Sequence, residues 1–456
     1  MLFNLDTIEQ HFDVPKERKE NYGEVVTEFS LIHKMFSQLP EHLFSDPNLT
    51  WLDVGAGYGY FSMVLFNKLF NGLKNIITDP KKRRNHILTK NIHMIEVNPY
   101  FKNYLIKYFS LHANIQIEDF INYSPNKKFD VIIGNVPYNI LGNIKTPTNK
   151  EKNKKKDGKT VWPLFIKKMV HILKDGGYLN VIIPSLWMKV DKAKMHSFLC
   201  NYNLLKCFCL TNTETNKCFK GNAQTPTCFF TLKKEPSQFS ISLYDSIYKA
   251  YIDTSYNLTK PIPLCGVSIV NKLKPYIKKY GYIETIKTNL PPKNVSLETT
   301  KTTAHPYINV HTCKLNGLQP TLEFKYSNKK LKYCGEPKLI LAHKMYGFPY
   351  YDISGVYGIS SRDNYIIKNK SHSDLLIFQS FLNTKLALYI FETTRYRMKY
   401  LEKEAFTFLP DISKIEDFPK EITNSSVFDY FDISIQERNY ILDFHKNYLS
   451  FTPLNI

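Results

Sequence analysis

Residues 129–139, FDVIIGNVPYN, form the stretch that decides the fold. Residues 131–133 are apolar and β-branched, which is typical of a buried strand in the middle of a parallel sheet. Asn135 follows at once, and then a turn in which Pro137 fixes its own φ and favours an extended Val136. We therefore expect a central strand that ends abruptly at a stiff, polar and aromatic turn.

The turn carries groups that suit a planar ligand. Asn135 offers an amide acceptor and an amide donor, Val136 offers a backbone carbonyl, and Tyr138 offers an aromatic face. In open α/β sheets, ligands bind just beyond the carboxyl ends of the strands. This combination suits a planar ring with an amino group, such as adenine. An ordinary turn that closes a strand has the same pattern, so the interpretation depends on the segments before it.

Composition limits the class of protein. The 456 residues suffice for two or three domains, and 43% of them are hydrophobic, enough for sizeable cores. The net charge of +20 favours a polyanionic partner, nucleic acid rather than a membrane surface. The alternative source of this charge is a generally lysine-rich proteome. No apolar run approaches the ~20 residues of a membrane span, and residues 1–6 do not resemble a secretory signal.

The cysteines point to a reducing compartment. All eight lie at or beyond Cys200, and no Cys-x-x-Cys pair exists. We therefore expect reduced thiols and no zinc site. The expected location is the cytoplasm, either of a bacterium or of a host cell in which a virus replicates.

A glycine-rich loop lies in residues 49–61, LTWLDVGAGYGYF. An apolar strand ends in Asp53, and the glycines that begin with Gly55 and Gly57 lead into a helix. Glycines there permit tight turning and close approach of the backbone to a ligand at the helix N-terminus. The spacing is Gly-x-Gly-x-Gly, not the Gly-x-Gly-x-x-Gly of dinucleotide-binding loops. An acid just before the loop would repel a pyrophosphate but bind an ammonium, which favours S-adenosyl-L-methionine over NAD.

Two further strands are expected between these segments. The first, residues 93–99, contains Glu96, and an acid at this position can accept both hydroxyls of a ribose. The second, residues 114–120, contains Asp119, which can accept the exocyclic amino group of an adenosine. Asp53, Glu96, Asp119 and Asn135 would thus all lie at carboxyl ends of strands. This repeated placement predicts a doubly wound α/β sheet.

Residues 145–159 contain seven lysines and two acids, and we expect either a solvated loop or a loop that contacts phosphates. An amphipathic helix over residues 161–173 and strands over 178–184, 206–210 and 227–232 follow. Phe219, beside a glycine, is either a second stacking surface or a core phenylalanine.

The pattern changes around residue 240. Residues 263–456 mix short aromatic strands with helices and basic residues, including one long helix over 378–401 that carries Arg395 and Arg397. We expect two domains, residues 1–240 for cofactor binding and catalysis and residues 241–456 for recognition of the target.

Taken together, these motifs resemble the N6-adenine DNA methyltransferases in which the cofactor part comes first and target recognition last, as in type II restriction-modification systems. Residues 53–59 resemble their cofactor loop, and residues 135–138 their Asn-Pro-Pro-Tyr motif, with Val136 in place of the first proline. Residues 22–27 are similar to the N-terminal segment that closes over the methionine part of the cofactor. The resemblance covers residues 20–235.

The resemblance implies a Rossmann-like class I methyltransferase sheet with a C-terminal α+β target-recognition domain. It implies S-adenosyl-L-methionine as the cofactor and duplex DNA with a flipped adenine as the substrate, with a separate restriction nuclease as a partner and without a membrane or a metal. The implied catalytic residues are Asn135, Val136, Pro137 and Tyr138. The implied cofactor-binding residues are Tyr22, Glu24, Thr27, Asp53, Gly55, Gly57, Glu96, Asp119, Phe120 and Asn135. The implied residues that stack on the target base are Tyr138 and Phe219.

Three alternatives stay open. Asn-x-Pro-Tyr-Asn also occurs in ribosomal RNA adenine dimethylases, whose usual layout is shorter, so an RNA adenine methyltransferase is the first. Methyltransferases of glutamine or small amines share this chemistry, but the basic loop and the large C-terminal half argue against them. The third is a nucleic-acid-binding module with a decayed site, against which the cofactor loop and Asn135 argue.

Overall fold

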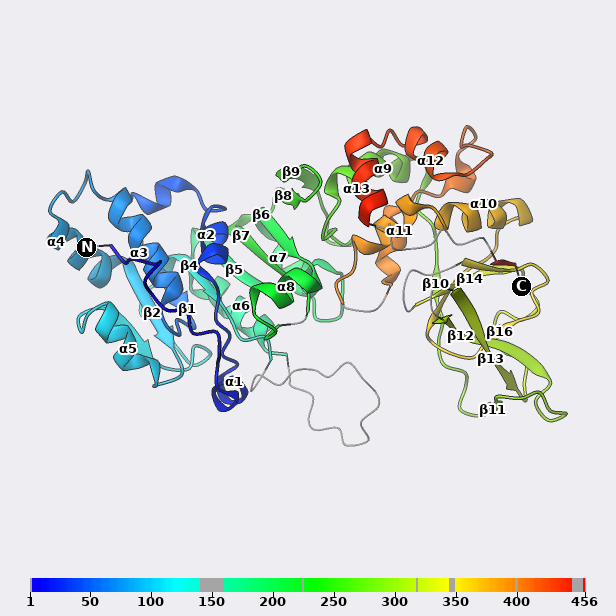
Figure 1. Cartoon of the computed structure of the whole chain (residues 1–456), viewed down its shortest axis with the longest axis horizontal. Coiled ribbons are helices and arrows are strands. Elements are labelled where there is room, and N and C mark those ends of the chain that lie inside the picture. Colours follow the sequence, from blue (N-terminus) through cyan, green and yellow to red (C-terminus); the bar gives the residue numbers. More distant parts are fainter. Residues whose placement is uncertain are drawn as a thin grey trace. The chain divides into compact units, whose positions relative to one another are not determined.

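The computed structural model describes residues 2–139, 160–223, 225–316, 319–343, 349–397, 401–444 and 454–455. The chain divides into two compact units (Figure 1). Unit 1 comprises Met1–Leu243 and Asp253–Thr259, and unit 2 comprises Tyr244–Ile252 and Lys260–Ile456. The lysine-rich segment 145–159 lies outside the described residues. No helix in the described ranges is long and apolar enough to cross a bilayer.

Unit 1 is an alternation of helices and strands. The helices are α1 Lys16–Tyr22, α2 Phe29–Phe36, α3 Tyr60–Gly72, α4 Pro80–His86, α5 Phe101–Tyr108, α6 Trp162–Ile172, α7 Met195–Cys200 and α8 Asn212–Cys218. Short helical turns are η1 Glu41–Phe44, η2 Ile87–Asn91 and η4 Ser185–Met188. The strands are β1 Trp51–Val54, β2 Ile92–Glu96, β3 Asn114–Ile117, β4 Phe129–Asn135, β5 Leu173–Pro184, β6 Tyr202–Leu210, β7 Thr227–Pro236, β8 Ser240–Asp245 and β9 Ala250–Ser255.

These strands form one sheet in the order β3-β2-β1-β4-β5-β7-β6-β8-β9. Strands β1 to β5 pair in parallel with their neighbours, whereas β7 is antiparallel to both β5 and β6. The strand order reverses direction at β1, which has β2 on one side and β4 on the other. The expected class I methyltransferase sheet is therefore confirmed, and its ligand edge is the carboxyl end of β1 and β4.

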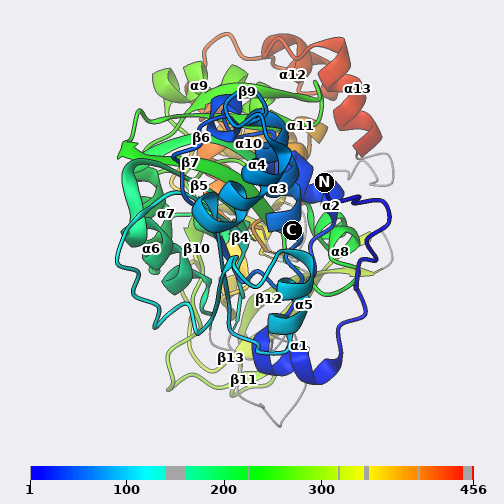
Figure 2. The ribbon, with the colours of Figure 1, turned by 90° about the vertical axis from the view of Figure 1, so that its left-hand side faces the viewer.

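Strand β4 is central because its apolar run is buried on both faces. Val131, Ile132 and Ile133 are each 0% exposed, as expected for a strand of a parallel sheet that helices cover on both sides. Helix α2 packs against α3 and against strand β5 (Figure 2). The N-terminal segment, which precedes the sheet in sequence, is in this way fixed beside the strands of the ligand edge.

Unit 2 is of the α+β class. Its helices are α9 Val267–Tyr280, α10 His372–Leu382, α11 Lys385–Glu392, α12 Asn424–Tyr430 and α13 Ile435–Phe444, with the turns η5 Lys403–Phe408 and η6 Ile412–Lys414. Its strands are β10 Ile286–Lys287, β11 Leu297–Glu298, β12 Tyr307–Asn316, β13 Gln319–Ser327, β14 Lys338–Ala342, β15 Pro349–Asp352, β16 Gly358–Ile359, β17 Asn364–Ile367 and β18 Leu454–Asn455. They form two sheets, β10-β17-β14-β15-β18 and β11-β13-β12-β16.

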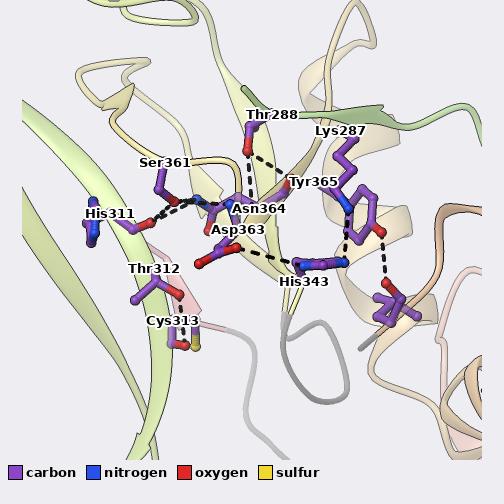
Figure 3. Close-up of polar contacts among 11 residues, drawn as sticks. Lys287, Thr288, His311, Thr312, Cys313, His343, Ser361, Asp363, Asn364 and Tyr365 are labelled. Carbon is purple, nitrogen blue, oxygen red and sulfur yellow. Dashed lines mark hydrogen bonds and ion pairs between the residues drawn. The ribbon is translucent and has the colours of Figure 1, made fainter. Parts of the chain in front are cut away.

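Polar contacts join these two sheets, as Figure 3 shows. The backbone carbonyl of His311, in β12, accepts hydrogen bonds from the Ser361 hydroxyl and, at 3.1 Å, from Nδ2 of Asn364. Asn364 begins β17, so a strand of one sheet is hydrogen-bonded to a strand of the other. Asn364 is also 0% exposed, which strengthens such bonds because water does not compete for them.

The expected long helix over residues 378–401 is wrong. Helix α10 ends at Leu382, and α11 begins at Lys385. The break is at Thr384, which has an extended backbone and whose side chain accepts a hydrogen bond of 3.3 Å from the N–H of Ala387. This N-cap starts a new helix instead of continuing the old one. Helix α11 ends at Glu392, so the two arginines lie beyond it.

Candidate functional site

The polar residues expected at strand ends lie along one edge of the sheet. Glu96 ends β2, Asn135 ends β4, and Asp53 is the residue before the last of β1. Strands β2, β1 and β4 are neighbours, and Val54 pairs with both Ile95 and Gly134. The sheet therefore brings together side chains that are far apart in sequence.

The glycine loop is bound to the neighbouring strand and lies beside Asn135. The N–H groups of Gly55 and Ala56 donate to the carbonyl of Ile95, over 2.9 and 3.1 Å. Gly55 has φ of +74°, and a Cβ built on it would lie 3.7 Å from the backbone oxygen of Asn135. The loop thus turns in a left-handed conformation that glycine adopts without strain.

Asp53 is a buried carboxylate with an unused acceptor. It is 1% exposed, and its Oδ2 accepts a 2.7 Å hydrogen bond from the hydroxyl of Ser62. Its Oδ1 is buried without a hydrogen-bond partner. Burial raises the pKa of Asp53 to about 7, and the nearby charge of Glu96 acts in the same direction. An ammonium group would satisfy Oδ1, so this residue fits the amino group of S-adenosyl-L-methionine.

Glu96 connects the cofactor loop to the end of β2. Its Oε2 accepts from the N–H of Gly57 and its Oε1 from the N–H of Asn98, each over 2.8 Å. Glu96 is 7% exposed, and burial raises its pKa, although these backbone hydrogen bonds oppose the shift. Each carboxylate oxygen keeps a further lone pair. The side chain therefore fits a group with two hydroxyls, such as a ribose.

The N-terminal segment adds a third carboxylate, that of Glu24. Helix α1 ends at Tyr22, a half-buried residue, and Gly23, with φ of 67°, caps the helix and turns the chain. Neither oxygen of Glu24 has a hydrogen-bond partner. Burial raises the pKa of Glu24 to about 7; Arg18 lowers it, and Glu96 raises it further. The interaction with Glu96 indicates that this segment lies close to the cofactor loop.

Arg18 is a residue that sequence reasoning missed. Its Nε lies 3.6 Å from Oε2 of Glu24, and its guanidinium donates a 3.2 Å hydrogen bond to the Tyr58 hydroxyl. The guanidinium carbon also lies 4.5 Å from the ring centroid of Tyr100. Arg18 thus binds α1 to the cofactor loop and to the segment after β2. No local motif signals this role, because Tyr58 and Tyr100 are distant from Arg18 in sequence.

Asn135 is bound to the N-terminal segment. Its Nδ2 donates a 3.1 Å hydrogen bond to Oγ1 of Thr27, which is 5% exposed. Among the described residues, Oδ1 of Asn135 accepts no hydrogen bond. The amide therefore presents a free acceptor beside the cofactor loop. The side chain of Val136, the next residue, is 2% exposed and packs inward.

The two aromatic residues expected to stack on the target base, Tyr138 and Phe219, differ in exposure. Tyr138, after Pro137, is a partly exposed residue, but its hydroxyl is buried without a hydrogen-bond partner, and burial raises its pKa. Phe219 is 1% exposed and packs in the core with Leu210 and Phe229. The structure therefore supports the core interpretation of Phe219 and not a stacking surface, because neither face of the ring is free.

Asp119 and Phe120 lie just after β3, which ends at Ile117. Asp119 is exposed, and its carboxylate accepts from the N–H of Ile121 at 2.9 Å and from Nδ2 of Asn122 at 3.1 Å. These bonds stabilise the turn at the end of the strand. Phe120 is 4% exposed and stacks on Phe165, with ring centroids 5.6 Å apart. Their contact with a cofactor stays a prediction.

Residues 26–219 match the family model described as the Eco57I restriction-modification methylase. The chain is 34% identical over 153 residues to the type II restriction enzyme and methyltransferase RM.Eco57I of Escherichia coli, over 31% of this chain and 15% of that protein. It is 27% identical over 116 residues to the type II methyltransferase M.TthHB8I of Thermus thermophilus, over 23% of this chain and 25% of that protein. The matches thus span a quarter or less of either relative's length.

Among solved structures, the chain is similar to a nuclease-deletion mutant of the Type ISP restriction-modification enzyme LlaGI, with a TM-score of 0.46, 11% identity, and coverage of 85% of this chain and 52% of that one. The sheet topology and these matches show a class I methyltransferase domain with S-adenosyl-L-methionine as its cofactor, in which residues 26–219 are similar in sequence to restriction-modification methylases.

Proposed function

We propose that this protein transfers a methyl group from S-adenosyl-L-methionine to N6 of an adenine flipped out of duplex DNA. The observation that carries the proposal is the amide of Asn135, whose Nδ2 is bound to Thr27 while its Oδ1 has no hydrogen-bond partner among the described residues. An acceptor beside the cofactor loop suits an incoming amino group. The matches to restriction-modification methylases support DNA as the substrate.

The residues of the edge have separate tasks in this proposal. The bound cofactor supplies an activated methyl group on a sulfonium. Oδ1 of Asn135 and the carbonyl of Val136 accept the two amino hydrogens of adenine, which localises the lone pair of the nitrogen and directs it at the methyl carbon. Positioning and preorganised electrostatics supply the rate as the nitrogen–carbon bond forms and the carbon–sulfur bond breaks, which leaves S-adenosylhomocysteine. The extra proton of the methylated nitrogen then passes to water, so the step needs no general base of altered pKa.

Three carboxylates hold the cofactor in this proposal, and one of their oxygens, Oδ1 of Asp53, is buried without a hydrogen-bond partner. Asp53 takes the ammonium, Glu96 takes the ribose hydroxyls, and Asp119 takes the amino group of the cofactor's adenine. Gly55 and Gly57 allow close approach of the backbone, and Phe120 borders the adenine side. Tyr22, Glu24 and Thr27 close the methionine side. Buried carboxylates are costly when unpaired, so a cationic ligand offsets part of their desolvation.

The target base must leave the helix, which costs a few kcal/mol. Tyr138, held in place after Pro137, recovers part of this cost because stacking of a base on an aromatic ring contributes about 1–3 kcal/mol. With Phe219 in the core, Tyr138 is the aromatic residue that we assign to this task.

Unit 2 recognises the DNA in this proposal. Lys287 and Arg362 are exposed, and Nζ of Lys287 lies 3.0 Å from Nε2 of His343, both labelled in Figure 3. Cations of this kind contact phosphates and make affinity depend steeply on salt concentration. A separate restriction nuclease, as in other restriction-modification systems, is the partner that we propose.

The test is methyl transfer from labelled S-adenosyl-L-methionine to unmodified bacterial duplex DNA, single-stranded DNA and RNA. Asn135→Ala is compared with Asn103→Ala, a matched change at an exposed position of α5. N6-methyladenine in duplex DNA that is lost only in Asn135→Ala supports the proposal. Label in RNA alone favours the RNA alternative. Cofactor binding without transfer to any substrate favours a decayed site. Absence of cofactor binding overturns the proposal that the protein is an enzyme.

A further inference from the structure

The contact between Thr27 and Asn135 joins two elements that are 108 positions apart in sequence. We propose that Thr27 is a positioning residue that couples the cofactor site to the catalytic amide. Its hydroxyl donates to the carboxylate of the bound cofactor's methionine part and accepts from Nδ2 of Asn135. This inference rests on the proposed function and adds to it the means by which the amide is oriented.

The orientation of the amide matters because its two ends have the same shape and opposite chemistry. Only Oδ1 can accept a hydrogen from the amino group of adenine. An amide of Asn135 turned by half a rotation would present two donor hydrogens to that amino group instead. Among the described residues, Thr27 is the single side chain to which this amide is hydrogen-bonded, so the choice of orientation depends on it.

A threonine hydroxyl alone does not make this choice. It can both donate and accept, and so it would bond either end of an amide. The orientation of the Asn135 amide is fixed once the hydroxyl hydrogen of Thr27 is donated to another acceptor. In the described residues no acceptor takes the hydrogen of Thr27, although this side chain is 5% exposed. Glu24, in the same segment, does not take it, since neither of its oxygens has a hydrogen-bond partner.

A carboxylate is the acceptor that completes the arrangement, because an ionised carboxylate can only accept. Once it takes the hydroxyl hydrogen, Thr27 offers only lone pairs to its other neighbour. Asn135 must then turn Nδ2 toward Thr27 and Oδ1 toward the substrate. Occupation of the cofactor site therefore sets the amide in the orientation that accepts the target amino group.

The experiment follows the side-chain amide of Asn135 by nuclear magnetic resonance on the full chain, labelled with ¹⁵N asparagine. The Asn135 signal is assigned by its loss in Asn135→Asp. The probes are S-adenosylhomocysteine, which carries the carboxylate, and methylthioadenosine, which does not. Binding of each probe is measured independently by calorimetry. We expect S-adenosylhomocysteine to shift the Asn135 signal in the wild type and in Thr27→Ser, and methylthioadenosine to bind without that shift.

Thr27→Val retains the shape of the side chain and removes the hydroxyl. We expect the shift to be absent in this variant. At saturating cofactor its kcat falls by about 10- to 100-fold, and Thr27→Ser restores it. An equal shift in Thr27→Val, or in the wild type with methylthioadenosine, overturns the inference and leaves the proposed function intact. Absence of S-adenosylhomocysteine binding to the wild type overturns both.

Discussion

The hydroxyl of Ser62, in the first turn of α3, donates a 2.7 Å hydrogen bond to Oδ2 of Asp53, whose Oδ1 has no partner. This hydrogen bond lowers the pKa of Asp53, while burial raises it to about 7. The carboxylate is therefore half protonated near neutral pH and ready to ionise when an ammonium binds.

The first prediction is a pH-dependent affinity for the cofactor. The ammonium binds the ionised form of Asp53, so affinity for S-adenosylhomocysteine rises with pH through about 7. One such group changes the affinity about tenfold for each pH unit below its pKa. Glu24, with a pKa raised by burial to about 7, acts in the same direction. Calorimetric titrations from pH 5.5 to about 8 measure the profile.

Two variants show how much Asp53 contributes to the pH dependence of cofactor affinity. Asp53→Asn binds more weakly above about pH 7 and with a shallower slope, because position 53 no longer titrates. Ser62→Ala removes a bond to the ionised carboxylate, so the midpoint moves to higher pH. A wild-type affinity that is flat over this range would show that the cofactor does not bind at Asp53.

The second prediction concerns Tyr138. Its hydroxyl is buried without a hydrogen-bond partner, so Tyr138→Phe removes an unsatisfied group and leaves stability equal or higher. The ring, which stacks on the target base in our proposal, is retained, so methyl transfer persists. Tyr138→Ala loses about 1–3 kcal/mol of stacking. The rate of methyl transfer to duplex DNA is measured for both variants. A loss of rate in Tyr138→Phe as large as in Tyr138→Ala would mean that the hydroxyl acts in the reaction.

The sequence predicts the parallel strands and the ligand edge because both depend on local patterns. Buried parallel strands are continuous apolar runs, and the polar residue that ends each run is its neighbour in sequence. Asp53, Glu96 and Asn135 could therefore be assigned to strand ends from their sequence neighbours alone. The registers of β1 with β2 and β4 place them at one edge, as the pattern predicts.

Contacts between distant segments could not be predicted in this way. Arg18 contacts Glu24, Tyr58 and Tyr100, and no spacing rule relates these residues. The burial of Phe219 is decided by packing around it, since a phenylalanine beside a glycine suits either a core or a surface. The break before α11 depends on one capping threonine within an otherwise helical pattern.

The third prediction concerns Gly134, which directly precedes Asn135. Its φ is +148°, and an added Cβ would lie 2.6 Å from the carbonyl oxygen of Val54 in the neighbouring strand. Gly134→Ala must therefore separate β1 from β4, and we expect a loss of more than about 2 kcal/mol of unfolding free energy. Urea denaturation of the full chain measures it.

The matched control for Gly134→Ala is Gly176→Ala. Gly176 also has a positive φ, +76°, but nothing lies within 4 Å of an added Cβ. The substitution there costs only the strain of the backbone conformation, about 1 kcal/mol. Equal losses in the two variants would show that backbone conformation, and not the contact with Val54, limits position 134.

The last prediction concerns the buried ion pair of unit 2. Nζ of Lys338, in β14, lies 2.5 Å from Oδ2 of Asp352, in β15, and both side chains are 0% exposed. Asp352 also accepts from the N–H groups of Val356 and Tyr357, over 3.1 and 3.0 Å. Burial lowers the pKa of Lys338, and the charge of Asp352 opposes this shift. Asp352→Ala leaves a buried ammonium without its partner, which costs about 3–5 kcal/mol.

Lys368 and Glu336 provide the matched comparison in the same unit. Their Nζ–Oε2 distance is also 2.5 Å, but their side chains are 21% and 47% exposed. Water and salt screen this pair, so Glu336→Ala costs less than about 1 kcal/mol. Urea denaturation of the full chain, at low and at high salt, distinguishes the two: the loss in Asp352→Ala persists in salt because the pair is buried. If Asp352→Ala were as stable as Glu336→Ala, Lys338 would have to be neutral or to reach water when its partner is removed.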